Sequence, residues 1–390
     1  MTTISSFQNF LPVKVRFGEG IAQTLPDALV ELSATKVFLM VDEGIEDHNP
    51  AVKALLADVL SDRRFSFTRF DKPAAEPTIA MVDEATASLV ASGATVVVAL
   101  GGGSVIDTAK AARLCTQLGV GFKEFLGAAP TYPAPELALI AMPTSAGTGS
   151  EVSGGAVISD PEAGKKAGIA NANLRAQIAL VDPLLTHSMP PSMTANTGVD
   201  ALAQAIAATV AIVRTPIGDA IAFEAIRMMT PALVAAYNDG TDSAARAAMS
   251  CGSMMAGLSM NISDCTAEHS LGQAIGGVKH VPHGLTIGLV VAETLERERQ
   301  FIPEQLERVA DAMGEPDDGS RDGSRAVRAV KKVLAALNFP VLSDLEFSES
   351  DLDALADLAL SDYFITMSPQ TWTKEEVIGA FRSALALTSR

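Results

Sequence analysis

The chain has 390 residues, 48% of them hydrophobic, and its formal net charge is −17 at pH 7. This length allows two domains with their own cores, and the negative charge argues against nucleic acids and anionic membranes as partners. Three cysteines are too few for a disulfide framework, and the opening residues, MTTISSFQNF, lack the pattern of a secretory signal, so we expect a cytoplasmic protein.

Apolar runs alternate with helical patterns in the first half of the chain. Residues 11–20, LPVKVRFGEG, predict a short strand that ends in a glycine turn, and such an exposed strand edge favours pairing with a second chain. Later runs have the apolar character of strands buried on both faces, and they lie at 36–42, 95–100 and 137–143. Because helical patterns lie between them, as at 49–62 and 77–93, the order predicts βαβ units and a parallel sheet.

The segment ALGGGSVIDTAK, residues 99–110, places three glycines between a predicted strand and a predicted helix. The free N–H groups of a helix N-terminus bind anions, and glycine lets a phosphate approach the backbone closely. The spacing is not that of the common G-x-G-x-x-G fingerprint, so a purely structural tight turn remains an alternative.

Two further features follow predicted strands. The loop MPTSAGTGSE, residues 142–151, is rich in small and hydroxyl side chains, and it would face the same crevice as the glycine turn, at the carboxyl ends of parallel strands. Asp42 ends the strand at 36–42 and could hold the ribose diol of a dinucleotide while repelling a 2′-phosphate. A plain turn residue is the alternative interpretation of Asp42.

The pattern becomes almost wholly helical after two prolines near 185–192, where we place a domain boundary. The expected domains are 1–188, an α/β dinucleotide-binding domain, and 189–390, an all-helical domain. The most apolar stretch, residues 201–213, is too short to span a bilayer. Residues 314–325, GEPDDGSRDGSR, predict a polar loop.

The helical half contains a carboxylate and two histidines that could bind a metal. Asp200 and Gln204 are four residues apart on one predicted helix, and His269 and Gln273 have the same spacing on another. His283 lies in a Pro-His-Gly turn fourteen residues after His269. One carboxylate and two imidazoles suit zinc or iron(II). Two alternatives remain open: the residues are unrelated, or Asp200 caps the start of its helix.

Taken together, these motifs resemble the iron-containing (group III) alcohol dehydrogenase family. The resemblance covers nearly the whole chain and includes VRFGEG, GGGSVIDTAK, PTSAGTGSEV, TGVDAL and HVPHG in the family's order. It implies an N-terminal dinucleotide-binding α/β domain and an all-helical C-terminal domain, the dehydroquinate synthase-like fold, with catalysis between them. It also implies that the N-terminal segment pairs across a two-fold axis, so we expect at least a homodimer.

The resemblance also implies which residues bind NAD. Gly102, Gly103, Ser104 and Asp107 match the family's pyrophosphate loop, and Asp42 matches the strand-end acid associated with NAD rather than NADP. Three residues match a second cofactor loop, and one matches a cofactor-side lysine. These residues are Thr144, Ser145, Thr148 and Lys166.

The family's four metal ligands are an Asp and three His, and this chain departs from that set. Asp200, His269 and His283 match the first, third and fourth ligands, but Gln204 stands at the position of the second. Gln273 replaces a histidine close to the nicotinamide. Two further departures are Ala207, in place of a glutamate, and Glu76, in place of an asparagine. These changes leave the metal, iron(II) or zinc, and the dependence on a metal open.

The resemblance implies an NAD-dependent alcohol dehydrogenase or aldehyde reductase that acts on a small alcohol or aldehyde with help from one divalent ion. The residues expected to act in catalysis are His269, Gln273 and His283. A metal-independent reductase of the maleylacetate type is one alternative. A protein that binds NAD but has lost its chemistry is another.

Overall fold

The computed structural model describes residues 6–73, 76–127, 132–162 and 165–387, with the backbone alone described at 165–167. The chain divides into two compact units. One unit comprises residues 11–189 together with 240–251, and the other comprises residues 6–10, 190–239 and 252–387. Residues 240–251, which the sequence placed in the helical domain, therefore cluster with the α/β unit.

Within its described residues, the α/β unit contains a six-stranded sheet with the strand order β1-β8-β5-β4-β2-β3, in which every pair is parallel. The strands in that order are Lys14–Phe17, Ile178–Val181, Ala138–Pro143, Val96–Gly101, Lys36–Asp42 and Ser66–Lys72. A separate antiparallel hairpin pairs β6 with β7, which are Gly155–Asp160 and Lys165–Ala170. The parallel sheet was predicted, whereas the strands β3 and β8 and the hairpin were not.

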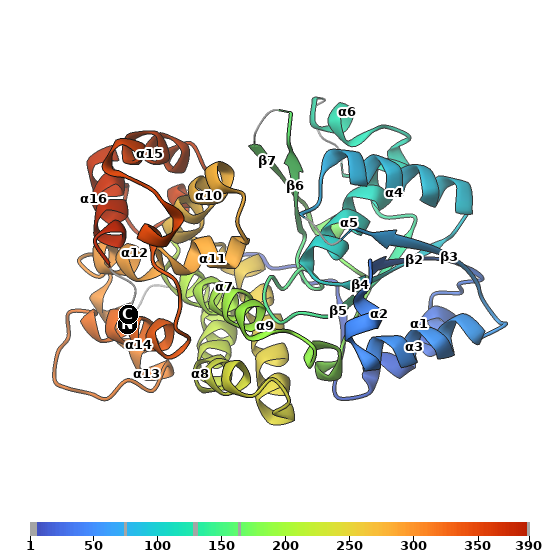
Figure 1. The fold of residues 1–390 in the computed structure, drawn as a ribbon, viewed down its shortest axis with the longest axis horizontal. Coiled ribbons are helices and arrows are strands. Elements are labelled where there is room, and N and C mark those ends of the chain that lie inside the picture. The colour runs from blue at the N-terminus through green and yellow to red at the C-terminus, as the bar shows by residue number, and fades with distance from the viewer. Residues whose placement is uncertain (1–5, 74–75, 128–131, 163–164, 388–390) are drawn as a thin grey trace. The chain divides into compact units, whose positions relative to one another are not determined.

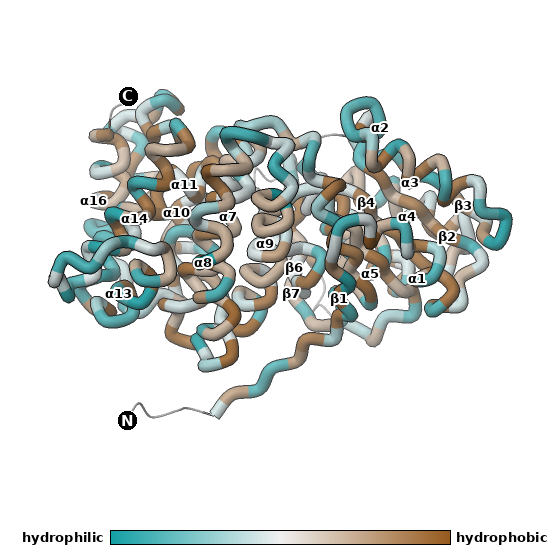
Figure 2. Tube along the Cα trace, turned by 90° about the horizontal axis from the view of Figure 1, so that it is seen from below, coloured by the Kyte–Doolittle hydropathy of each residue, from teal (hydrophilic) through white to brown (hydrophobic). Residues whose placement is uncertain are grey.

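Helices cover both faces of this sheet (Figure 1). The helices of this unit are α1 Leu25–Glu31, α2 Ile45–His48, α3 Pro50–Ser61, α4 Ile79–Ser92, α5 Gly103–Leu118 and α6 Phe122–Gly127, with the 3₁₀ turns η1 Ile21–Thr24, η2 Ala172–Leu174 and η3 Pro183–Thr186. Alternate residues of β2 explain the two layers: Val37 and Leu39 pack with α1 and α3, and Phe38 packs with α4 and α5. Figure 2 shows β2 and β4 as hydrophobic, as strands buried on both faces must be.

The other unit is helical in its described residues. Its helices are α7 Pro191–Val210, α8 Pro216–Asn238, α9 Ser243–Ser263, α10 Ala267–Lys279, α11 His283–Gly288, α12 Val291–Glu298, α13 Pro303–Ala312, α14 Ser324–Ala336, α15 Leu352–Leu360 and α16 Lys374–Leu385, with the 3₁₀ turns η4 Leu342–Leu345, η5 Glu349–Asp351 and η6 Phe364–Met367. Helix α9 begins in the α/β unit and ends in this one. Helices α10, α15 and α16 share one hydrophobic cluster, and α7 packs along α8.

One helix, α8, is long and apolar enough to cross a membrane when only length and composition are considered. Core helices pass the same test. Here α8 packs along α7, and its Asp219 pairs with Arg214 at 2.8 Å. We therefore treat α8 as a core helix of this unit. The three cysteines, all within the described residues, are free thiols.

Candidate active site

The glycine turn lies between β4 and α5. Gly102 is the N-cap residue of α5, and its N–H donates to Oδ2 of Asp42 at 3.1 Å. A Cβ on Gly101 would lie 2.5 Å from the Val105 side chain and 2.8 Å from Asp42 Oδ2, so the turn excludes any larger residue there. The first turn of α5, which contains Gly103 and Ser104, therefore presents backbone N–H groups that have no partner within the helix.

The second loop follows β5, which is the neighbour of β4 in the sheet. The Thr144 N–H donates to the Gly101 carbonyl at 3.0 Å. A Cβ on Gly103 would lie 2.6 Å from Thr148 Oγ1, so the two loops are in close contact. Thr144 is buried, and Ser145 and Thr148 are half-buried. Backbone N–H groups and hydroxyls from the two loops thus gather at the carboxyl ends of adjacent strands, where open α/β sheets bind ligands.

Asp42 is the last residue of β2 and is half-buried. Burial raises the pKa of Asp42, and the hydrogen bond from Gly102 and the charge of Lys72 oppose that rise. One carboxylate oxygen is already committed to the Gly102 N–H. Asp42 therefore joins the end of β2 to the glycine turn. A ribose was predicted from the sequence to bind at this place.

Asp107 has a different setting from the residues of the turn. Its carboxylate accepts hydrogen bonds from the Ser150 hydroxyl at 2.5 Å and from the Val157 N–H at 3.0 Å, and Lys110 Nζ lies 3.7 Å away. These contacts join α5 to the loop after β5, through Ser150, and to the hairpin strand β6, through Val157. Lys166 belongs to β7, where it is paired with Ser159, and its side chain lies outside the described residues.

In the helical unit, α7 carries Asp200 and Gln204 on one face, and both are buried. Asp200 lies nine residues after the first residue of α7, so the alternative in which it caps a helix start is wrong. Gln204 Nε2 donates to Asp200 Oδ2 at 3.2 Å. A carboxylate in the middle of a buried helix needs compensation, because an unpaired buried charge is strongly unfavourable.

Two imidazoles from the next helices meet this carboxylate. His269 Nε2 lies 3.5 Å from Asp200 Oδ1, and His283 Nε2 lies 3.7 Å from the same oxygen. His269 is on α10 as predicted, whereas His283 opens the short helix α11 rather than lying in a turn. A Cβ on Gly284 would lie 2.1 Å from the Asn196 carbonyl, so only glycine lets α11 approach α7 this closely.

The ligand atoms of Asp200, His269 and His283 all lie within 4.8 Å of one another. Among the described residues, Asp200 Oδ1, Gln204 Oε1 and His269 Nε2 are buried without a hydrogen-bond partner. Such orphaned atoms are rare in native proteins and call for an explanation. Asp200 and His269 belong to this cluster, and Gln204 is hydrogen-bonded to Asp200. A single divalent cation would satisfy the Asp200 and His269 atoms, and the residues fit a metal centre.

The charges around the cluster favour the same conclusion. Burial acts to raise the pKa of Asp200, but the nearby His283 and His269 outweigh it, and the pKa is lowered. Burial acts to lower the pKa of His269, but Cys265, Asp200 and Glu268 outweigh it, and the pKa is raised. The site therefore stabilises a positive charge close to the carboxylate, which a protonated His269 or a metal ion would supply.

Several residues behind His269 were not predicted from the sequence to belong to the site. Glu268 and Cys265 are buried beside it, and Glu298, the last residue of α12, is 1% exposed. The only signal in the sequence was that Glu268 is adjacent to the predicted ligand His269. Gln273 is half-buried one turn along α10, Ala207 is buried in α7, and Glu76 Oε2 accepts from the Ser159 hydroxyl at 3.2 Å.

Comparison with known proteins shows two family matches that together span most of the chain. Residues 12–183 match the model of the iron-containing alcohol dehydrogenases, and residues 194–385 match that of the family's C-terminal region. The probable alcohol dehydrogenase EutG of Escherichia coli is 33% identical over 350 residues, which are 89% of this chain and 87% of the relative.

Solved structures are similar over nearly the whole chain. A 1,3-propanediol oxidoreductase has a TM-score of 0.92 and 26% identity, over 97% of this chain and 100% of its own. A sulfoacetaldehyde reductase from Bifidobacterium kashiwanohense, solved in complex with NAD⁺, has a TM-score of 0.90 and 26% identity, over 98% and 100%. The matched structures thus share the α/β and helical organisation described above.

Proposed function

The chain belongs to the iron-containing alcohol dehydrogenase family, and we propose that it is an NAD-dependent alcohol dehydrogenase or aldehyde reductase that acts on a small alcohol or aldehyde with one divalent ion. The observation that carries this proposal is the pair formed by Asp200 Oδ1 and His269 Nε2, two buried atoms without hydrogen-bond partners, 3.5 Å apart. Family membership implies NAD and an iron-type metal. Zinc, a cytoplasmic location and dimerisation are our further proposals.

In this proposal Asp200, His269 and His283 hold the ion, with the Gln204 amide oxygen as a weak fourth ligand. When bound, the ion supplies Lewis-acid polarisation of the substrate oxygen, and NAD supplies the hydride acceptor. The residues of the chain bind and orient the cofactor. The glycine turn and the Thr144–Thr148 loop hold the dinucleotide phosphates, and Asp42 holds the ribose.

Metal analysis and turnover test the proposal together. The purified protein is assayed for iron and zinc, then for NADH oxidation with a panel of small aldehydes, before and after chelation and after add-back of each ion. We expect turnover that chelation removes and that one ion restores. Full activity after chelation would favour the metal-independent reductase, for which Gln204 in place of a histidine is the supporting observation. No turnover with any aldehyde, despite NADH binding, would favour a protein that has lost its chemistry.

The cofactor preference depends on Asp42. The wild type should favour NAD(H) over NADP(H) by about 10- to 100-fold in kcat/KM, because a carboxylate at the ribose repels a 2′-phosphate. Asp42→Asn keeps an acceptor for the Gly102 N–H and removes the charge, so the preference should shrink at least several-fold. Asp71→Asn is the matched control, since it removes an exposed carboxylate that pairs with Arg69. Equal efficiency of the wild type with both cofactors would contradict this role.

We propose that β1 pairs with a second copy of the chain. β1 is an edge strand, bonded to β8 on one side in the described part of the sheet. The Lys14 and Gly18 N–H groups donate to Gln177 and Val181 on that side. The two-residue period of a strand therefore points the Val15 N–H towards the open edge, where it is available to another strand.

Light scattering at micromolar concentration should give twice the chain mass of 40.5 kDa. Val15→Pro removes the outward N–H but leaves the β8 pairing intact, and proline is tolerated on edge strands. The dimer should therefore dissociate in Val15→Pro and persist in Val15→Ala. A monomeric wild type would rule out the dimer, and a dimeric Val15→Pro would place its interface elsewhere.

A further inference from the structure

Glu268 is buried at the start of α10, next to His269 in sequence and in space. Its Oε1 lies 2.8 Å from His269 Nδ1 and accepts from the Thr266 N–H at 3.2 Å. Its Oε2 accepts a hydrogen bond from the Thr266 hydroxyl. Thr266 is the N-cap residue of α10, so the carboxylate also lies at the positive end of the helix dipole. These contacts hold Glu268 in one orientation against the imidazole.

This contact determines where the proton of a neutral His269 lies. A carboxylate only accepts hydrogen bonds, so Nδ1 must carry the hydrogen that lies between the two groups. Nε2 is then a lone pair, and it faces Asp200 Oδ1, a second acceptor, at 3.5 Å. Both atoms are buried without partners among the described residues. Glu268 thus prepares His269 to donate Nε2 to a cation.

We infer that Glu268 is a positioning residue of the metal centre, which fixes the tautomer and ring orientation of His269 and strengthens it as a ligand. The inference rests on the proposed metal site. A carboxylate behind a ligating imidazole raises its basicity, and losing such a partner weakens metal binding by about 10- to 100-fold. A more basic His269 matters in this chain, because Gln204 offers the metal only a neutral amide oxygen, which is a weaker ligand than an imidazole.

The residues around Glu268 also allow a second position for the metal, behind His269. Cys265, Glu268 and His269 also have ligand atoms within 4.8 Å of one another, so a metal could bind behind His269 through Nδ1. Burial raises the pKa of the Cys265 thiol to about 11, which disfavours the thiolate that a metal requires. Both Glu268 oxygens are also engaged by Thr266. These observations favour Glu268 as a hydrogen-bond partner rather than a ligand.

The experiment measures dissociation constants for Zn²⁺ and Co²⁺ by competition with a chromogenic chelator. Glu268→Gln keeps an oxygen that accepts from Nδ1–H but removes the charge, and we expect about 10-fold weaker binding. Glu268→Ala removes the acceptor too, and we expect about 100-fold weaker binding. Thr266→Val removes only the hydroxyl that orients Glu268 and should weaken metal binding a few-fold. This variant tests the role of Glu268 if the Glu268 variants do not fold.

Glu298→Gln is the matched control. Glu298 is equally buried, and neither of its carboxylate oxygens has a hydrogen-bond partner among the described residues. Burial, with the charge of Glu268, raises the pKa of Glu298 and favours its neutral form, so replacement by a neutral amide should leave the Zn²⁺ and Co²⁺ constants within twofold of the wild type. Thermal unfolding of each metal-free variant separates loss of fold from loss of affinity.

The outcomes separate the role of Glu268 from the existence of the metal site. Unchanged metal affinity in folded Glu268→Gln and Glu268→Ala, with metal bound by the wild type, overturns the role of Glu268 and leaves the metal site intact. A wild type that binds neither ion overturns the site and this role together. A sulfur-to-cobalt charge-transfer band in the Co²⁺ protein, lost in Cys265→Ala, would show that the metal binds behind His269 and would also overturn the inference.

Discussion

His283→Ala is expected to lose bound metal and turnover together. The variant removes one of two imidazoles from the cluster, so the dissociation constant for Zn²⁺ or Fe²⁺ should rise by more than the roughly 100-fold that loss of an outer partner produces. A Lewis acid is worth several kcal/mol at the transition state, and about 1.4 kcal/mol is tenfold in rate, so kcat/KM should fall about 10³-fold. Elemental analysis and steady-state kinetics measure the two effects.

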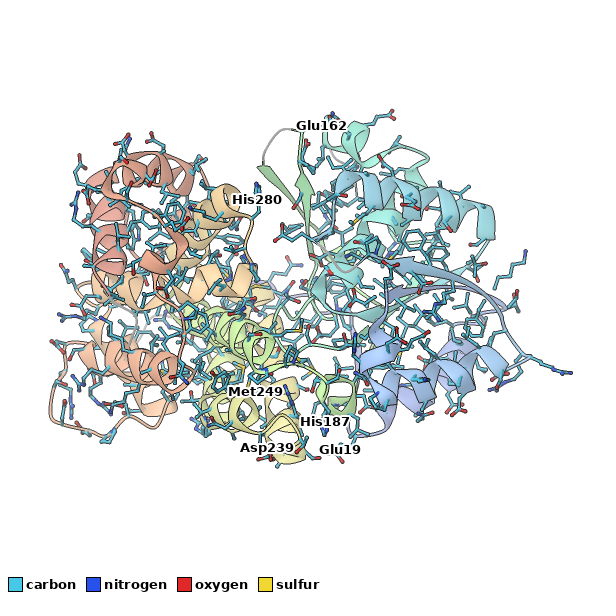
Figure 3. All side chains as sticks on the ribbon, viewed as in Figure 1. Glu19, Glu162, His187, Asp239, Met249 and His280 are labelled. Atoms are coloured by element: carbon cyan, nitrogen blue, oxygen red, sulfur yellow. The ribbon has the colours of Figure 1, made fainter. Side chains whose placement is uncertain are left out.

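The fold should tolerate this change, because His283 is the first residue of α11 and its side chain is 34% exposed. His280→Asn is the control. His280 is exposed at the C-cap of α10, with φ at 52°, a conformation that asparagine adopts readily (Figure 3). The control should keep its metal and its activity. If His283→Ala kept both, the cluster would not be the catalytic metal site.

Strands β1, β2, β4 and β5 of the sheet could be predicted because their signal is local. The run at 36–42 is the strand Lys36–Asp42, since burial on both faces requires an unbroken apolar sequence. The pair Asp200 and Gln204 could also be predicted to share a face, since four residues are about one helical turn. The hairpin β6–β7 was missed, because its residues mix small, polar and apolar side chains without a clear period.

The contacts between elements could not be predicted in the same way. His283 reaches Asp200 only because Gly284 lets α11 approach the Asn196 carbonyl, a fact of packing between segments about 90 residues apart. Asp107 looks like a residue of the phosphate turn in sequence, yet its carboxylate bonds Ser150 and the Val157 N–H. Packing between distant segments decides both positions, and no local sequence pattern indicates that packing.

Gln204→His is expected to bind the metal at least about 10-fold more tightly than the wild type. Gln204 lies on the same face of α7 as Asp200, and its Oε1 is buried without a partner among the described residues. Imidazole nitrogen is a better ligand for zinc and iron than an amide oxygen. The gain should exceed the loss of the hydrogen bond from Nε2 to Asp200, which is worth about 1 kcal/mol. Chelator competition gives the dissociation constants.

Gln204→Leu makes this measurement decisive, because it keeps the volume of the side chain and removes its oxygen. If Gln204 is a weak ligand, the constants should order as His tightest, Gln intermediate and Leu weakest. The Gln204→His enzyme should also keep its metal through purification, where we expect the wild type to lose part of its own. Equal affinity in all three proteins would mean that residue 204 does not reach the ion. The metal would then be held by Asp200, His269 and His283 alone.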